Sequence, residues 1–192
     1  MQHKETNMPI VEPSPEDTQD PVVAPLFKFF RDMAPAVPNL FLTLARAPHI
    51  FKGWSEFAWP MRKESTSPRY IRELAIIRVL QITKADNEFV YHAGMGLRAG
   101  LKQAQIDALV KWRTADVYSP RERAVLAVAE EIAIGPAASE ASMLELKRHF
   151  SDSEVLEITM TSCFYVLVAR FIFSMGIEHD DPAVISAIVA RV

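Results

Sequence analysis

Glu88 and His92 are the residues whose types and spacing point first to chemistry. They are four positions apart in a predicted helix, so their side chains share one face of it. A carboxylate beside an imidazole raises the proton affinity of the ring and fixes which nitrogen carries the proton, which suits general acid–base catalysis near neutral pH. We therefore expect His92 to transfer protons, with Glu88 as its orienting partner or as a second proton carrier.

Two other polar residues are expected in the same pocket. Tyr91 lies on the adjoining flank of the helix, where its hydroxyl could donate to developing negative charge. Glu73 lies on the preceding predicted helix, which must pack against this one. The neighbouring side chains are apolar, and Gly94 and Gly96 each cost a helix about 1 kcal/mol relative to alanine, which indicates close approach of another helix or a ligand. The alternative interpretation is a solvated Glu–His pair on the surface.

The elements that position these residues are predicted to be helices. Ser67 and Pro68 are typical of the first positions of a helix, Gly100 of a left-handed cap, and Ser119 with Glu122 of a capping box. Patterns of alternating apolar residues and hairpin turns are absent, so we expect an all-α helical bundle. Short helices are expected between the prolines of residues 26–60, and longer ones over residues 68–84, 86–99, 103–114, 120–135, 139–150 and 151–176, with a last short helix from Pro182.

Residues 1–24 are expected to form a flexible, acidic, proline-containing tail, because they hold too few apolar side chains to offset the entropy of ordering. Residues 25–192 are expected to form a single all-helical domain. The predicted helix over residues 151–176 is apolar around most of its circumference and must be covered on all sides. Each exposed large apolar side chain forgoes about 1.5–3 kcal/mol of burial, which favours a homo-oligomer.

Composition excludes several classes of function. The net charge is -3 and no basic run is present, so a nucleic-acid partner is not expected. The uncharged run over residues 158–169 is too short to span a membrane, which needs roughly 20 residues, and no apolar stretch occurs near the N-terminus. A cytoplasmic protein is expected. The histidines lack the spacing of a metal site, so neither metal nor cofactor is expected. The single cysteine, Cys163, excludes any mechanism with two thiols in one chain.

Residues 72–101 read RELAIIRVLQITKADNEFVYHAGMGLRAGL. This string resembles the signature of the carboxymuconolactone decarboxylase family, also called the alkyl hydroperoxidase D-like family, in which an R-E-L helix precedes an E-[WYF]-x-x-H segment and an A-G-L turn. The later segments SPRERAVLAVAEEI and FSDSEVLEITMTSCFYVLVARFIFSMGIEHDD resemble the second half of the family in order and spacing. The resemblance covers about residues 40–182.

The resemblance implies a cofactor-free homo-oligomer of the alkyl hydroperoxidase D-like type. Glu73 and His92 fall on the family's R-E-L glutamate and its histidine, and Glu88 on a glutamate of the decarboxylase-like branch. The peroxidase branch has two cysteines at the positions of Ala85 and Glu88, so thiol-dependent peroxide reduction is not expected. Tyr91 stands where decarboxylase-like relatives often carry a histidine.

The resemblance therefore implies a lyase that removes carbon dioxide from a cyclic or enolisable carboxylic acid, such as a lactone acid. In this interpretation His92 is the general acid–base, Glu88 its partner, Glu73 a pocket carboxylate and Tyr91 a donor. An arginine such as Arg78 would offset the charge of an anionic substrate. Two alternatives remain: an isomerase or hydrolase that acts on a related lactone with the same residues, and an inactive oligomeric binding protein.

Overall fold

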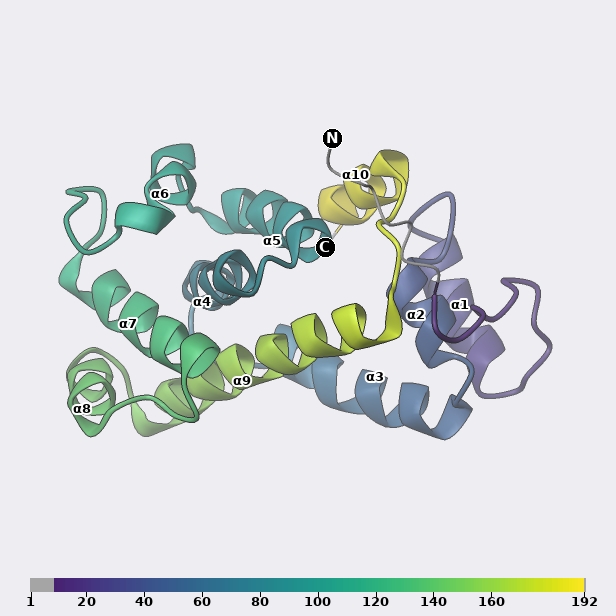
Figure 1. Ribbon diagram of the computed structural model, residues 1–192, viewed down its shortest axis with the longest axis horizontal. Coiled ribbons are helices and arrows are strands. Elements are labelled where there is room, and N and C mark those ends of the chain that lie inside the picture. The colour runs from purple at the N-terminus through teal and green to yellow at the C-terminus, as the bar shows by residue number, and fades with distance from the viewer. Residues whose placement is uncertain (1–8, 192) are drawn as a thin grey trace. The chain divides into compact units, whose positions relative to one another are not determined.

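The computed structural model describes residues 9–191, which contain helices and loops but no strand (Figure 1). The all-α prediction is confirmed. The helices are α1 (Val23–Arg31), α2 (Asn39–Leu44), α3 (Pro48–Lys63), α4 (Arg69–Thr83), α5 (Asp86–Ala99), α6 (Gln103–Asp107), the 3-10 turn η1 (Leu109–Lys111), α7 (Pro120–Ile134), α8 (Glu140–His149), α9 (Asp152–Met175) and α10 (Pro182–Arg191).

The described residues divide into two compact units where one domain was expected. One unit comprises residues 9–58 and 170–191, and the other comprises residues 59–169. The boundaries fall inside α3 and α9. Every residue proposed for catalysis from the sequence belongs to residues 59–169 and therefore lies in this second unit.

The first unit has an aromatic core. Phe27 and Phe51 are completely buried with their ring centroids 6.0 Å apart, and Phe41 stacks on Phe30 at 4.2 Å. Favourable aromatic pairs of this kind add about 0.5–1.5 kcal/mol beyond the burial of their area. The aromatic residues of this region therefore serve chiefly as core in the first unit.

Residues 9–22 differ from the flexible tail that the sequence predicts. The amide of Ser14 donates to the carbonyl of Leu42 at 3.0 Å, and the amide of Ile10 donates to that of Met175 at 3.0 Å. Backbone hydrogen bonds to α2 and α9 supply the ordering that composition alone does not reveal. Residues 1–8 of the expected tail lie outside the described residues.

Helix α4 is the centre of the second unit. Its residues from Ile71 to Leu80 are buried without interruption, and it packs against both α5 and α7 (Figure 1). The apolar side chains of this helix join two clusters, one shared with α7, α8 and α9, and the other with α5, α6 and α7. A charged residue within this stretch must therefore find a partner or be strongly destabilising.

The turn after α4 brings α5 back alongside it. Lys84 adopts a left-handed conformation with φ 59°, and the amide of Ala85 donates to the carbonyl of Leu80 at 3.0 Å. Gly100 ends α5 with φ 114°, as predicted. A Cβ atom at Gly96 would lie 2.7 Å from Leu101 Cδ1, just past the end of the same helix, and 3.5 Å from Cβ of Glu73 on α4, which is an ordinary van der Waals distance.

Some helix boundaries differ from the prediction. The helix expected over residues 103–114 is divided into α6 and η1, and α3 continues through Pro60. Pro68, and not Ser67, is the residue that precedes α4. The capping box of Ser119 and Glu122 is present at the start of α7.

Helix α9 is long and apolar enough to cross a membrane by length and composition alone. Its most apolar window has a mean hydropathy of 1.6, and 39% of that window is buried inside the protein. The uncharged run over residues 158–169 is shorter than this helix, because α9 continues beyond Arg170 to Met175. A core helix of a soluble protein meets the same criterion, so this property decides nothing about a membrane.

Candidate active site

The side chains of His92 and Glu73 form a buried hydrogen-bonded pair between α5 and α4. His92 Nδ1 lies 2.7 Å from Glu73 Oε2, and the two residues are 4% and 1% exposed. Because an ionised carboxylate only accepts hydrogen bonds, Nδ1 must carry the proton. Glu73, from the neighbouring helix, thus takes the orienting position that the sequence analysis gave to Glu88.

Arg69 completes the coordination of the Glu73 carboxylate. Its Nε donates to Glu73 Oε1 at 2.6 Å from one helical turn earlier in α4. The two oxygens of Glu73 are therefore divided between an arginine and a histidine. An ion pair with further hydrogen bonds is the arrangement in which a buried charge is tolerated.

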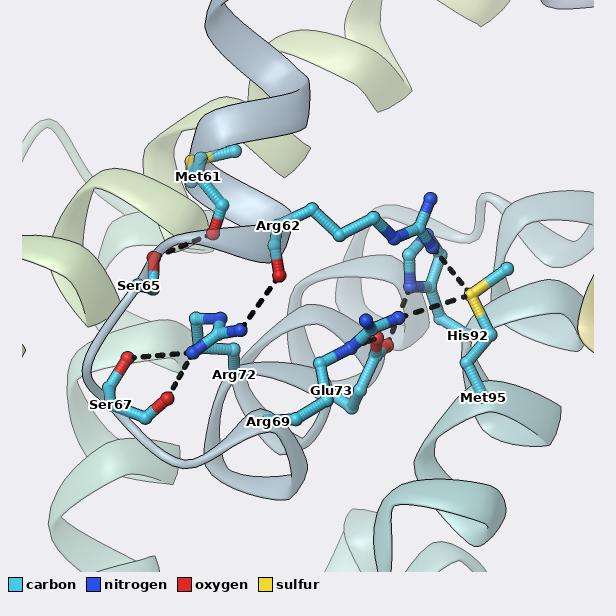
Figure 2. A network of polar contacts seen from close by, with 9 residues as sticks. All are labelled: Met61, Arg62, Ser65, Ser67, Arg69, Arg72, Glu73, His92 and Met95. Atoms are coloured by element: carbon cyan, nitrogen blue, oxygen red, sulfur yellow. Dashed lines mark hydrogen bonds and ion pairs between the residues drawn. The ribbon is translucent and has the colours of Figure 1, made fainter. Parts of the chain in front are cut away.

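Arg62, from the end of α3, reaches the same place. Figure 2 shows the guanidinium groups of Arg62 and Arg69 converging on the sulfur of Met95, beside His92. A thioether is a weak acceptor, so this contact compensates little of the charge of a guanidinium group. The site thus combines one carboxylate, one imidazole and two arginines.

The surroundings set the protonation states of the pair. Burial alone would raise the pKa of Glu73, but His92, Arg69 and Arg62 outweigh it and lower the pKa to about 2. Burial lowers the pKa of His92 below its usual 6.5; the carboxylate of Glu73 opposes this shift, and Arg62 and Arg69 add to it. Near neutral pH the pair therefore consists of a carboxylate and a neutral imidazole.

Nε2 of His92 is the atom left for chemistry. It makes no hydrogen bond to any of residues 9–191, whereas Nδ1 is held by Glu73. The ring of Tyr165, from α9, meets the imidazole edge-to-face with the centroids 4.6 Å apart. A ring fixed on one side by a carboxylate and on another by an aromatic side chain offers Nε2 in a single orientation to accept or return a proton.

The other predicted residues are placed differently. Tyr91 is buried on α5, but the aromatic residue that contacts the His92 ring is Tyr165. Glu88 is partly exposed. Burial raises the pKa of the Tyr165 hydroxyl, and the negative charges of Glu73 and Glu88 raise it further. Arg78, named as a possible compensating cation, instead binds Glu130 and the carbonyl of Leu109.

Three site residues were missed in the sequence. Arg69 precedes Glu73 by four positions, so the helical spacing that drew attention to His92 would have found it. Arg62 and Tyr165 come from other helices, and no local pattern links them to His92. Contacts of that kind depend on tertiary packing.

Residues 9–191 contain no group of three or more His, Cys, Asp and Glu side chains placed to hold a metal ion. Cys163 is exposed on α9, and His149 pairs with Glu145 on α8 at 3.1 Å.

Solved structures share this fold. A cysteine-to-alanine variant of the debrominase Bmp8 in complex with 2,3,4-tribromopyrrole has a TM-score of 0.74 at 19% identity, over 93% of this chain and 95% of that one. An alkylhydroperoxidase AhpD core, an uncharacterized peroxidase-related protein from Ralstonia eutropha JMP134, has a TM-score of 0.71 at 24% identity, over 91% and 92%. The fold is thus of the alkyl hydroperoxidase D-like type.

The site falls within a sequence family. Residues 48–131 match the family model described as the carboxymuconolactone decarboxylase family, and this stretch includes Arg62, Glu73 and His92. The uncharacterized protein YdfG of Bacillus subtilis (strain 168) is 27% identical over 100 residues, which is 51% of this chain and 68% of that protein. The part of the chain that holds the candidate site is thus similar to the carboxymuconolactone decarboxylase family, and the fold is of the alkyl hydroperoxidase D-like type.

Proposed function

We propose that the protein is a cofactor-independent lyase that decarboxylates a cyclic or enolisable carboxylic acid, such as a lactone acid, with His92 as its proton carrier. The observation that carries this proposal is the buried hydrogen bond between His92 Nδ1 and Glu73 Oε2, which leaves Nε2 for the substrate. A thiol peroxidase is not proposed, because the chain has one cysteine.

The proposed reaction begins with the neutral imidazole and an anionic substrate. The negative charge of the substrate, added to that of Glu73, favours protonation of Nε2 by solvent. The bond between the substrate's carbon and its carboxylate then breaks, carbon dioxide leaves, and the electron pair is delocalised into the adjacent carbonyl as an enolate. Nε2–H protonates the carbon and the ring returns to its neutral form. One carboxylate and one proton thus yield the shortened product and carbon dioxide.

The runner-up is an isomerase or hydrolase that acts on a related lactone with the same residues. The lowered pKa of His92 favours it, because a ring that is neutral at rest can accept a proton from carbon or from water. Tyr91, Tyr165 and Glu88 are the nearby groups that could stabilise an enolate or carry a second proton. An inactive binding protein is the remaining alternative.

The dependence of kcat/KM on pH separates these reactions. In the proposed decarboxylation, the anionic substrate reacts with the enzyme whose His92 is protonated. We therefore expect kcat/KM to be constant below the pKa of His92 and to fall about tenfold per pH unit above it. Because the bound anion raises the pKa of His92, kcat should fall only at a higher pH. Release of carbon dioxide from γ-lactones that carry a carboxylate on the carbon next to the carbonyl is measured in parallel. A kcat/KM that instead decreases as pH falls through this pKa, without carbon dioxide, would favour the isomerase or hydrolase.

We also propose a cytoplasmic homo-oligomer that acts on a small carboxylic acid or lactone, without nucleic acid or a membrane as partner. Exposed apolar side chains on one stripe of α9 support the oligomer: Leu156, Met160 and Leu167 are 64%, 43% and 50% exposed. Light scattering is expected to give a mass of at least twice the 21.6 kDa of one chain, and a monomer at micromolar concentration would contradict the proposal.

A further inference from the structure

Arg62 is a cation at the site without an acidic partner. Its guanidinium group donates to the sulfur of Met95 and lies 5.8 Å from the ring centroid of Trp59, and it forms no ion pair with any of residues 9–191. Arg69, by contrast, is held by the carboxylate of Glu73 at 2.6 Å. Of these two arginines, Arg62 is the one whose charge is available to a ligand.

Two side chains hold the backbone at and after Arg62: Arg72, which Figure 2 shows, and Glu157. The buried side chain of Arg72 donates to the carbonyl of Arg62 at 3.0 Å and also binds the hydroxyl and the carbonyl of Ser67. The carboxylate of Glu157 accepts hydrogen bonds from the backbone amides of Thr66 and Ser67 at 2.9 and 2.7 Å. The segment between α3 and α4 is thereby fixed, so little ordering entropy is lost when Arg62 binds a ligand.

We propose that Arg62 binds the carboxylate of the substrate beside His92, with Arg69 as a second, neighbouring cation. This inference rests on the proposed function, which requires an anionic substrate at Nε2, and adds the residue that selects for its charge. A guanidinium group offers paired N–H donors that match the two oxygens of a carboxylate. The contacts of both arginines with Met95, on the same helix as His92 and three residues after it, place this anion site next to the imidazole.

The position of the charge predicts how Arg62 affects kinetics. A cation bound to the carboxylate stabilises the bound acid and the transition state nearly equally, while most of the charge is still on the carboxylate. Arg62 should therefore lower KM and leave kcat much less affected. A residue with a merely structural role would not separate the two constants in this way.

Binding of γ-butyrolactone-α-carboxylate, whose carboxylate is on the carbon next to the lactone carbonyl, and of its neutral methyl ester, measured by calorimetry, tests the proposal. In Arg62→Gln the dissociation constant of the acid is expected to rise about 10- to 100-fold, with that of the ester unchanged. Arg98→Gln, which removes the same charge from the exposed face of α5, is the control and should bind both as wild type does. Equal binding of the acid by wild type and Arg62→Gln would overturn the proposal, as would a wild type that does not distinguish acid from ester.

The result separates this inference from the proposed function. A wild type that binds the acid through Arg62 but releases no carbon dioxide from it would refute the chemistry and support the anion site. If Arg62→Gln releases carbon dioxide from the acid with an unchanged KM, the chemistry is supported and the anion site is refuted. If Arg62→Gln fails to fold, Arg62→Lys is used, which keeps the positive charge but lacks the paired N–H groups of arginine. Weaker binding of the acid by this variant supports the proposal. Binding as tight as in wild type would contradict a paired hydrogen bond from Arg62 to the carboxylate.

Discussion

Replacing His92 by glutamine is expected to lower kcat/KM for a decarboxylated lactone acid by about a hundred- to ten-thousand-fold. The amide retains a polar group of similar reach but cannot take up and return a proton, and general acid–base catalysis is worth this much. The measurement is the rate of carbon dioxide release with saturating and limiting substrate. Circular dichroism of the variant verifies that the helices remain.

A second Glu–His pair in the same unit provides a matched control. His149 and Glu145 are four positions apart on α8, with Nε2 and Oε1 3.1 Å apart, but Glu145 is exposed and no arginine joins the pair from another helix. His149→Gln should therefore leave kcat/KM unchanged. Wild-type turnover in His92→Gln, or an equal loss in both variants, would remove His92 from the mechanism.

Replacing Glu73 by glutamine is expected to reduce both stability and activity. Removal of one partner from a buried ion pair costs about 3 kcal/mol or more, because the charge of Arg69 loses its compensation. Loss of the carboxylate also releases the His92 ring from a single tautomer, so kcat/KM should fall about a hundredfold. Urea unfolding and steady-state kinetics measure the two effects separately.

The pH dependence of this loss identifies its cause. The pKa of Glu73 is lowered to about 2 in the folded protein from 4.5, so its ionised form stabilises the fold fully above pH 4.5 and loses this effect as pH falls toward 2. The difference in free energy of unfolding between wild type and Glu73→Gln should therefore shrink over this range. Glu145→Gln, which removes an exposed carboxylate with an arginine and a histidine as partners, should have little effect at any pH. A difference for Glu73→Gln that does not vary with pH would contradict the ionic origin.

Much of the fold could be predicted because its signals are local. The segment between α4 and α5 is short, Gly100 adopts the left-handed conformation that its position implied, and the Ser119 and Glu122 capping box begins α7. Two local signals failed: α3 continues through Pro60, and residues 103–114 do not form one helix. Backbone bonds to distant residues likewise order residues 9–22.

The sequence singled out His92 and Glu73, which meet at the candidate site, but not the hydrogen bond between them. The spacing of Glu88 and His92 satisfies the rule for neighbours on one helix, yet that rule takes no account of other helices. Glu73 lies in a continuous buried stretch of α4, and a carboxylate there requires partners. The apolar residues around Glu73 in the sequence already indicate that its carboxylate is buried. A buried carboxylate needs partners such as a histidine and an arginine.

Nitrogen NMR of the His92 imidazole tests most directly which carboxylate orients this ring. At neutral pH wild type should show a protonated Nδ1 with a strongly deshielded proton and an unprotonated Nε2. This signal should disappear in Glu73→Gln and persist in Glu88→Gln. Its loss in Glu88→Gln together with its persistence in Glu73→Gln would contradict the pairing on which the proposed chemistry depends.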